Sequence, residues 1–147
     1  MTLTRATDYG VRAMIYLAGL PQGERASLAE LARHADVPLS FLAKVMQRLV
    51  RAGLVVSHRG KGGGFELAAG RLNISLLDIL NALDGVPALN VCLLSAATCQ
   101  HHAWCAAHLV WLEARSRMLE VLAAASLNSL VNTTRLQRQA VGLGWTP

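Results

Sequence analysis

The sequence predicts a mainly α-helical fold: a winged helix-turn-helix with a small β-hairpin wing, followed by a long C-terminal dimerisation helix. Three observations predict it: helical apolar periods in the first half of the chain, two short strand-like segments around a glycine-rich turn, and a long apolar pattern near the C-terminus. We expect a winged helix domain over residues 1–85, a loop over 86–102, the dimerisation helix and C-terminal segment over 103–135, and a tail over 136–147.

Apolar spacing and capping residues predict the first two helices. A helix over about residues 4–20 carries apolar side chains at helical period and stops before Pro21. Ser27 and Glu30 have the spacing of a capping box, in which each side chain accepts a hydrogen bond from the backbone N–H of the other residue. The sequence therefore predicts a second, short helix that begins after Ser27.

A third helix, over about residues 38–52, separates an apolar face from a basic one. Pro38 suits the first turn, where a backbone N–H is not needed. Helical spacing places four apolar side chains on the side expected to face the core: Leu42, Val45, Met46 and Leu49. The opposite side carries Ser40, Phe41, Lys44, Gln47, Arg48 and Arg51. In a helix-turn-helix, such a face lies in the major groove of DNA, where polar side chains reach base edges.

A hairpin with a basic tip is predicted next. Residues 54–58 and 65–67 have strand character, and the six residues 59–64 between them include four glycines. Glycine allows the positive φ angles that a tight turn requires. We expect Arg59 to enter a minor groove of DNA. Phosphate contacts are expected from four further side chains: Lys44, Arg48, Arg51 and Lys61.

The distribution of charge also indicates a nucleic acid as partner. The chain has a formal net charge of +5, and residues 37–65 contain five Lys and Arg side chains with no Asp or Glu. A basic stretch in an otherwise balanced chain is typical of a protein that binds the phosphate backbone. The glycine-rich turn matches neither the dinucleotide-binding fingerprint nor the P-loop, and no paired nucleophile and base is apparent, so an enzyme is not predicted.

Composition bears on location and assembly. The apolar fraction of 53% exceeds the roughly 45–50% of ordinary soluble domains, which favours an oligomer. The first residues lack the pattern of a secretory signal, so we expect a cytoplasmic protein. Residues 85–112 carry no Asp, Glu, Lys or Arg, but Pro87 and several polar side chains interrupt them too often for a bilayer helix. No membrane association is therefore predicted.

Two helical patterns follow the wing. Residues 75–83 predict a fourth short helix closed by Gly85. The pattern over about residues 102–127 predicts a long helix that is apolar on nearly every side. Its one polar stripe is made by Glu113, Ser116, Arg117 and Glu120. A helix of roughly 35 Å is too long for so small a body to cover, so we expect it to form the interface of a homodimer.

Three cysteines are the candidates for a metal centre. Cys92, Cys99 and Cys105 are separated by six and five residues, and His108 follows the third after one helical turn. Thiolates select iron-sulfur clusters, zinc or cuprous copper, and the absence of a C-x2-C pair disfavours structural zinc. Three thiolates leave one position, for which His108 and Asp8 are the candidates. A metal-free thiol redox switch and a zinc-stabilised binding module are the alternatives.

Taken together, the motifs resemble a known family. The pair Leu3 and Thr4, residues 7–14, the wing sequence 59–64 and the cysteine segment are similar, over about residues 1–135, to the IscR/NsrR/RirA family of winged helix iron-sulfur transcription regulators. The resemblance implies a homodimer whose iron-sulfur cluster alters promoter binding. Such a dimer would act on double-stranded DNA operators with dyad symmetry, and we expect it to be a repressor.

The resemblance points to two branches of that family at once. Residues 7–10, Thr-Asp-Tyr-Gly, resemble the nitric-oxide-sensing branch, in which Asp8 would be the non-cysteine ligand of a [4Fe-4S] cluster. Residues 105–108, Cys-Ala-Ala-His, with Trp111 after them, resemble the cluster-biogenesis branch, in which His108 would complete a [2Fe-2S] cluster. The sequence thus leaves open the cluster type, the signal (nitric oxide, redox state or iron status), the DNA-binding form and the target genes.

Overall fold

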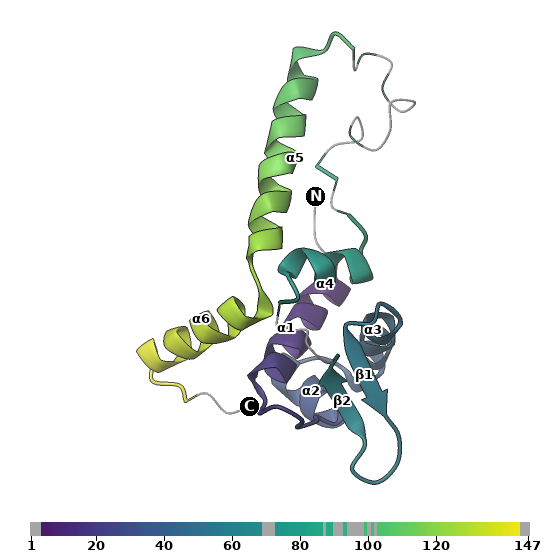
Figure 1. Ribbon diagram of the computed structural model, residues 1–147, viewed down its shortest axis with the longest axis vertical. Coiled ribbons are helices and arrows are strands. Elements are labelled where there is room, and N and C mark those ends of the chain that lie inside the picture. Colours follow the sequence, from purple (N-terminus) through teal and green to yellow (C-terminus); the bar gives the residue numbers. More distant parts are fainter. Residues whose placement is uncertain are drawn as a thin grey trace.

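A computed structural model describes residues 4–68, 73–86, 88–89, 93, 99, 101 and 103–144. Its elements in chain order are α1 (Arg5–Gly19), α2 (Leu28–Ala35), α3 (Leu39–Arg51), β1 (Val55–His58), β2 (Gly64–Leu67), α4 (Leu76–Leu83), α5 (Ala106–Ala124) and α6 (Leu127–Ala140). Helices α1 to α4 and the hairpin form one body, from which α5 projects (Figure 1). The mainly α-helical winged helix-turn-helix predicted from the sequence is confirmed.

The helix-turn-helix is built as the sequence predicts, with the ends of α1 and α3 within one residue of expectation. The capping box at the start of α2 is present, because Glu30 N–H donates to Ser27 Oγ over 3.2 Å and Ser27 N–H donates to Glu30 Oε2 over 2.8 Å. Asp36 ends α2 in the left-handed region, with φ of 56°. Pro38 was expected in the first turn of α3, but it is the N-cap residue, and the helix begins at Leu39.

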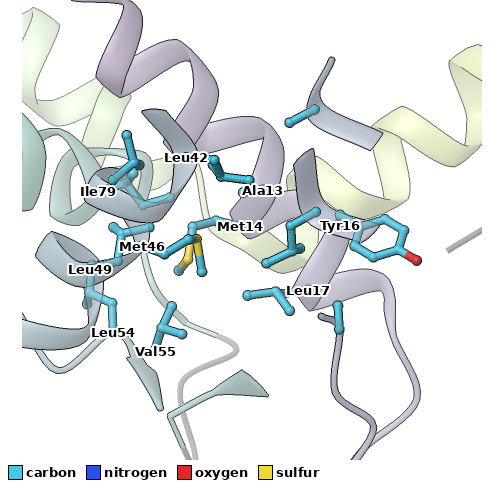
Figure 2. Packing of buried hydrophobic residues seen from close by; sticks show 14 of the residues in the cluster. Ala13, Met14, Tyr16, Leu17, Leu42, Met46, Leu49, Leu54, Val55 and Ile79 are labelled. Carbon is cyan, nitrogen blue, oxygen red and sulfur yellow. The ribbon is translucent and has the colours of Figure 1, made fainter. Parts of the chain in front are cut away.

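The apolar face of α3 forms the centre of the core. Side chains from α1, α3, α4 and the segment that leads into β1 converge there (Figure 2). The four predicted core residues of α3, Leu42, Val45, Met46 and Leu49, are each at most 2% exposed. Because this face is buried against α1 and α4, the opposite face of α3 is held toward solvent.

The wing is an antiparallel hairpin in which Val55 pairs with Leu67 and His58 pairs with Gly64. Residues 60 and 62 at its tip have φ of 89° and 80°, which only glycine adopts readily. On the outer side of β2, Phe65 exchanges two backbone hydrogen bonds with Ala26, the residue before the α2 cap. The wing is therefore attached to the start of the helix-turn-helix.

The C-terminal half differs from the single long helix predicted over residues 102–127. Helix α5 begins later, and a turn separates it from α6. The turn is paired with the segment before α4, since Leu76 N–H donates to Ala125 O and Leu127 N–H donates to Ile74 O, each over 2.8 Å. Backbone groups that bond to this neighbouring segment cannot continue a helical ladder, so α5 ends here. No helix in the described ranges is long and apolar enough to cross a membrane.

Helix α6 was not predicted from the sequence. Its N-cap is Ser126, and it packs on α1 with Leu127 and Val131 buried. Arg135 donates to the carbonyl at the C-terminal end of α1 over 3.2 Å. Residues 136–140, which we assigned to a tail, belong to this helix, because one apolar side of it is anchored on the body.

Candidate nucleic-acid interface and cysteine-bearing segment

The side chains predicted to contact DNA are solvent-accessible. All eight are exposed: Ser40, Phe41, Lys44, Gln47, Arg48 and Arg51 on α3, with Arg59 and Lys61 at the wing tip. The wing follows α3 directly and its first strand packs against that helix. A basic helix face and a basic wing tip on one body can contact adjacent grooves of a duplex.

Phe41 is held in place before any ligand arrives. Its ring lies edge-on to Tyr9 of α1, with centroids 5.5 Å apart and planes at 88°. An edge-to-face pair of this kind is a favourable aromatic contact. Since Phe41 remains 39% exposed, part of the ring is still available to an apolar group such as a thymine methyl.

The two arginines near the end of α3 differ in their contacts. Arg51 donates through Nε to Gln47 O within its own helix over 3.4 Å, so its charge is left on the surface. Arg48 donates instead to the carbonyl of Leu83, the last residue of α4. Both were expected to contact phosphates, and nothing in the sequence distinguishes them, because the partner of Arg48 is 35 residues away.

A charged network lies on the strands of the wing. His58 Nε2 lies 2.6 Å from Glu66 Oε1 across the two strands, and Arg25 Nε donates to Glu66 Oε2 over 3.3 Å. The hydrogen bond with His58, followed by that with Arg25, lowers the pKa of Glu66 below its ordinary value. Glu66 in β2 is thus paired with two side chains, while Arg59 and Lys61 at the wing tip are exposed.

Asp84 joins the end of α4 to the start of α1. Its carboxylate accepts hydrogen bonds from Thr4 N–H (3.0 Å), Thr4 Oγ1 (2.7 Å) and Thr7 Oγ1 (2.6 Å). Loss of solvent raises the pKa of Asp84, but the bonds from Thr7 and Thr4, with the charge of Arg48, outweigh this and lower it overall. The sequence analysis did not single out Asp84, because no local pattern connects it with α1.

Residues 7–10, which carry the resemblance to the nitric-oxide-sensing branch, have distinct roles in the structure. Thr7 is buried on Asp84, and Tyr9 supports Phe41. Gly10 allows α1 to approach α4 closely, because a Cβ there would lie 2.3 Å from a methyl carbon of Leu83. Asp8 alone points to solvent, so within this motif it is the side chain available to an external group.

Asp8 is paired with Arg12 one turn along α1. The carboxylate and guanidinium lie 2.8 Å apart, and both side chains are about half exposed, at 53% and 51%. Arg12 also donates to the carbonyl of Ala35 at the end of α2 over 3.3 Å. An exposed pair of this kind contributes little to stability and can be exchanged for another partner at low cost.

The cysteine-bearing segment lies at the far end of α5. Cys105 is the N-cap of that helix and His108 follows within its first turn; both are half-buried, as is Cys99. Cys92 lies outside the described residues. Within the described part of the chain, no three potential metal-ligating side chains lie together. No side chain there caps α5, in contrast to the capping boxes of α2 and α4.

Helix α5 has no buried residue. Its exposed large apolar side chains, with the one just before it, are Trp104, Leu109, Val110, Trp111, Leu112 and Val121. The predicted polar stripe is present, with Arg117 paired to Glu113 and Ser116 to Glu120. Apolar surface on most sides of a projecting helix is typical of an element that packs against another chain.

Comparison with known proteins supports these observations. The Rrf2 family, described as an iron-dependent transcriptional regulator, matches residues 3–133. The chain is 25% identical to IscR of T. potens, with a TM-score of 0.75 over 94% of this chain and 91% of that one. It is 26% identical to CymR (YrzC), the global cysteine regulator of B. subtilis, with a TM-score of 0.72 over 90% of this chain and 98% of that one.

A third similar structure is CymR of Staphylococcus aureus, which is 26% identical, with a TM-score of 0.69 over 87% of this chain and 96% of that one. These matches extend over the helix-turn-helix, the wing and the projecting helix together. The family match covers most of the chain. The chain therefore belongs to the Rrf2 family of transcriptional regulators.

Proposed function

We propose that this regulator is a homodimeric repressor whose cysteine segment holds an iron-sulfur cluster that reports nitric oxide, redox state or iron status. Dyad-related operators would be bound through α3 and the wing. The observation that carries the sensing part is that Cys105 begins α5, a helix with no buried residue. One element would therefore bear both a cluster ligand and the dimer surface, so that a change at the cluster alters the arrangement of the two DNA-binding bodies.

The donor set suits an iron-sulfur cluster. Cys92, Cys99 and Cys105 would supply three thiolates, the ligand type that such clusters prefer. The amides of the first turn of α5 have no side-chain cap among the described residues, and helix amides of this kind can donate to a bound anionic group. The description of the Rrf2 family as iron-dependent also supports iron over zinc.

The two candidates for the fourth ligand require different assemblies. His108 lies within one turn of Cys105 and would ligate a cluster within its own chain. Asp8 lies on α1, in the body, whereas Cys105 caps the end of α5 that projects away from that body (Figure 1). A cluster bound by Cys105 would therefore receive Asp8 from the second subunit.

Anaerobic purification of the full chain tests the cluster. We expect a brown protein with sulfide-to-iron absorption and iron and acid-labile sulfide in equal amounts. Cys105→Ser should lose the colour, whereas His58→Ala, a histidine of the wing, should keep it. A colourless wild-type protein that contains stoichiometric zinc would overturn the cluster and favour the structural binding module.

Two variants separate the candidates for the fourth ligand. Asp8→Ala and His108→Ala are compared by absorption and electron paramagnetic resonance spectra, with iron content measured on each. Arg12→Ala is the matched control for Asp8, because it breaks the same ion pair but leaves the carboxylate. His101→Ala is the control for His108. A variant whose cluster is unaltered removes that residue from the ligand set.

Mixed dimers test whether Asp8 acts across the interface. A dimer of one Asp8→Ala subunit and one Cys105→Ser subunit retains one complete site if the ligand comes from the partner, and none if it comes from the same chain. We expect about half of the wild-type iron content in the first case. Iron below one tenth of the wild-type content would exclude Asp8 as a ligand from the partner.

A metal-free thiol switch is the second candidate. It is favoured by the similarity to CymR of Staphylococcus aureus, one structure of which is an oxidized form. Under this hypothesis the thiols themselves would be oxidised, and DNA binding would respond to peroxide after removal of all iron. A response that needs iron supports the cluster instead.

A further inference from the structure

We propose that Arg48 is a positioning residue that fixes the recognition helix α3 on α4, and that Arg48 and Asp84 together form the junction through which the cysteine segment influences DNA binding. The proposal rests on DNA binding through α3, as in the proposed function. It replaces the expectation that Arg48 contacts a phosphate.

The contact of Arg48 is well suited to hold two helices together. The last carbonyls of a helix have no intrahelical partners, and a cation near them also interacts favourably with the helix dipole. Arg48 supplies both effects to α4, because its Nη2 group donates to the carbonyl of Leu83. Arg48 is exposed like Lys44 and Arg51, but its guanidinium is bonded to α4.

Asp84 connects α1 to the same end of α4. It accepts hydrogen bonds from the backbone N–H and hydroxyl of Thr4, so a residue 80 positions away holds the N-cap residue of α1. The hydroxyl of Thr7, which is 1% exposed, has Asp84 as its acceptor. Loss of that acceptor would leave a buried hydroxyl without its bond, which is costly.

The location of this junction gives it a role beyond stability. Leu83 and Asp84 are the last residues of α4 and its cap, and the chain leads from them into residues 86–102, the predicted cluster-binding loop. Displacement of the end of α4 would therefore shift the hydrogen-bond partners of α1 and α3 together. A change in the cysteine segment would thus reach the recognition helix through the end of α4.

A matched pair of variants tests the role of Arg48. Arg48→Met and Arg51→Met remove the same charge from the same helix, and DNA binding is measured over a range of salt concentrations. The DNA is a fragment selected from random sequence by the wild-type protein. We expect Arg51→Met to reduce the slope of log K against log salt by about 0.9 per subunit without a change in melting temperature. We expect Arg48→Met to leave the slope unchanged and lower the melting temperature by roughly 3–8 °C.

The opposite pattern for Arg48→Met, a reduced salt slope with an unchanged melting temperature, would show that it contacts a phosphate and would overturn the proposal. If Arg48→Met does not fold, Asp84→Asn and Thr7→Val probe the same junction from its other side. Both should weaken operator binding at least threefold with an unchanged salt slope, and should reduce the difference in affinity between metal-loaded and metal-free protein. Wild-type values of both quantities in these variants would contradict the junction.

The same measurements distinguish failure of the junction from failure of the proposed function. A wild-type chain that binds no DNA in either metal state would overturn DNA binding by this dimer. In that case the junction is still judged by the melting temperatures of Arg48→Met and Arg51→Met. Equal temperatures for the two variants would exclude a positioning role for Arg48.

Discussion

The body of α1 to α4 and the projecting helix α5 differ in the burial of their apolar side chains. Leu42 in α3 is 0% exposed, whereas Leu109 in α5 is 70% exposed. The body separates apolar from polar side chains, so one chain covers its own core. Helix α5 is apolar on most sides and has no buried residue, so its own body leaves its apolar surface uncovered, as the proposed dimer would require. The high apolar fraction of the sequence thus has two different sources.

The largest difference between the regions is expected in the core. Leu42→Ala should lower the free energy of unfolding by about 2–5 kcal/mol, because it creates a cavity among fully buried side chains. Leu109→Ala makes the identical chemical change on an exposed surface, and at a concentration where the dimer is saturated it should cost less than about 1 kcal/mol. Urea unfolding measures both. Equal losses would refute the contrast between a self-sufficient body and an unpartnered helix.

The next effect concerns assembly. Val110→Lys introduces a charge at an exposed apolar position of α5 and should raise the dissociation constant of the proposed dimer at least tenfold, about 1.4 kcal/mol. Ser116→Lys adds the same charge on the polar stripe, near Glu120, and should leave it unchanged. Analytical ultracentrifugation over a dilution series measures both constants. Dissociation in the Ser116 variant but not in the Val110 variant would place the interface on the other face of α5.

A smaller effect is expected at the wing tip. Arg59→Gln should weaken DNA binding by roughly 1 kcal/mol and reduce the slope of log K against log salt by about 1. Arg25→Gln removes the same charge from a side chain that already pairs with Glu66 of β2. This variant should change the slope little. Fluorescence anisotropy in increasing salt gives both values. Identical slopes for the two variants would show that the tip does not contact DNA.

The smallest effect is the dependence of the body on acid. The pKa of Asp84 is lower in the folded chain than the value of about 3.9 of an unfolded aspartate, so its stabilisation is present above that pH and is lost as the pH falls through the folded pKa. Asp84→Asn should therefore lower the melting temperature at pH 7. Below about pH 4 the difference between wild type and variant should shrink. A difference that persists unchanged at pH 2 would assign the effect to packing rather than charge.

Much of the body follows from local sequence signals. The capping box of Ser27 and Glu30, the apolar face of α3 and the glycine-rich turn each specify a local structure, and the structure contains all three. Helix α6 also has a local signal that was overlooked, since Ser126 is an N-cap and Leu127, Leu130 and Val131 have helical spacing. These features are predictable because neighbouring residues determine them.

The contacts that bear on function are long-range, and sequence pattern did not indicate them. Arg48 and Arg51 are equivalent by type and by helical face, yet only Arg48 has a carbonyl of α4 within reach. Asp84 and Thr7 are 77 positions apart and meet only in the folded chain. For the proposed centre, the sequence offers Cys92, Cys99 and Cys105 as ligands and leaves His108 and Asp8 as alternatives for the fourth. The choice between them depends on whether a second subunit brings Asp8 to the cysteines, and a single sequence contains no such information.

The turn between α5 and α6 limits how α5 can move relative to the body. Two backbone hydrogen bonds, Leu76 N–H to Ala125 O and Leu127 N–H to Ile74 O, bind this turn to the residues at the start of α4. The tilt of α5 is therefore not an independent degree of freedom of the chain. Any rotation of that helix about its lower end has to break these bonds or carry α4 with it, and α4 holds α1 and α3 at its other end.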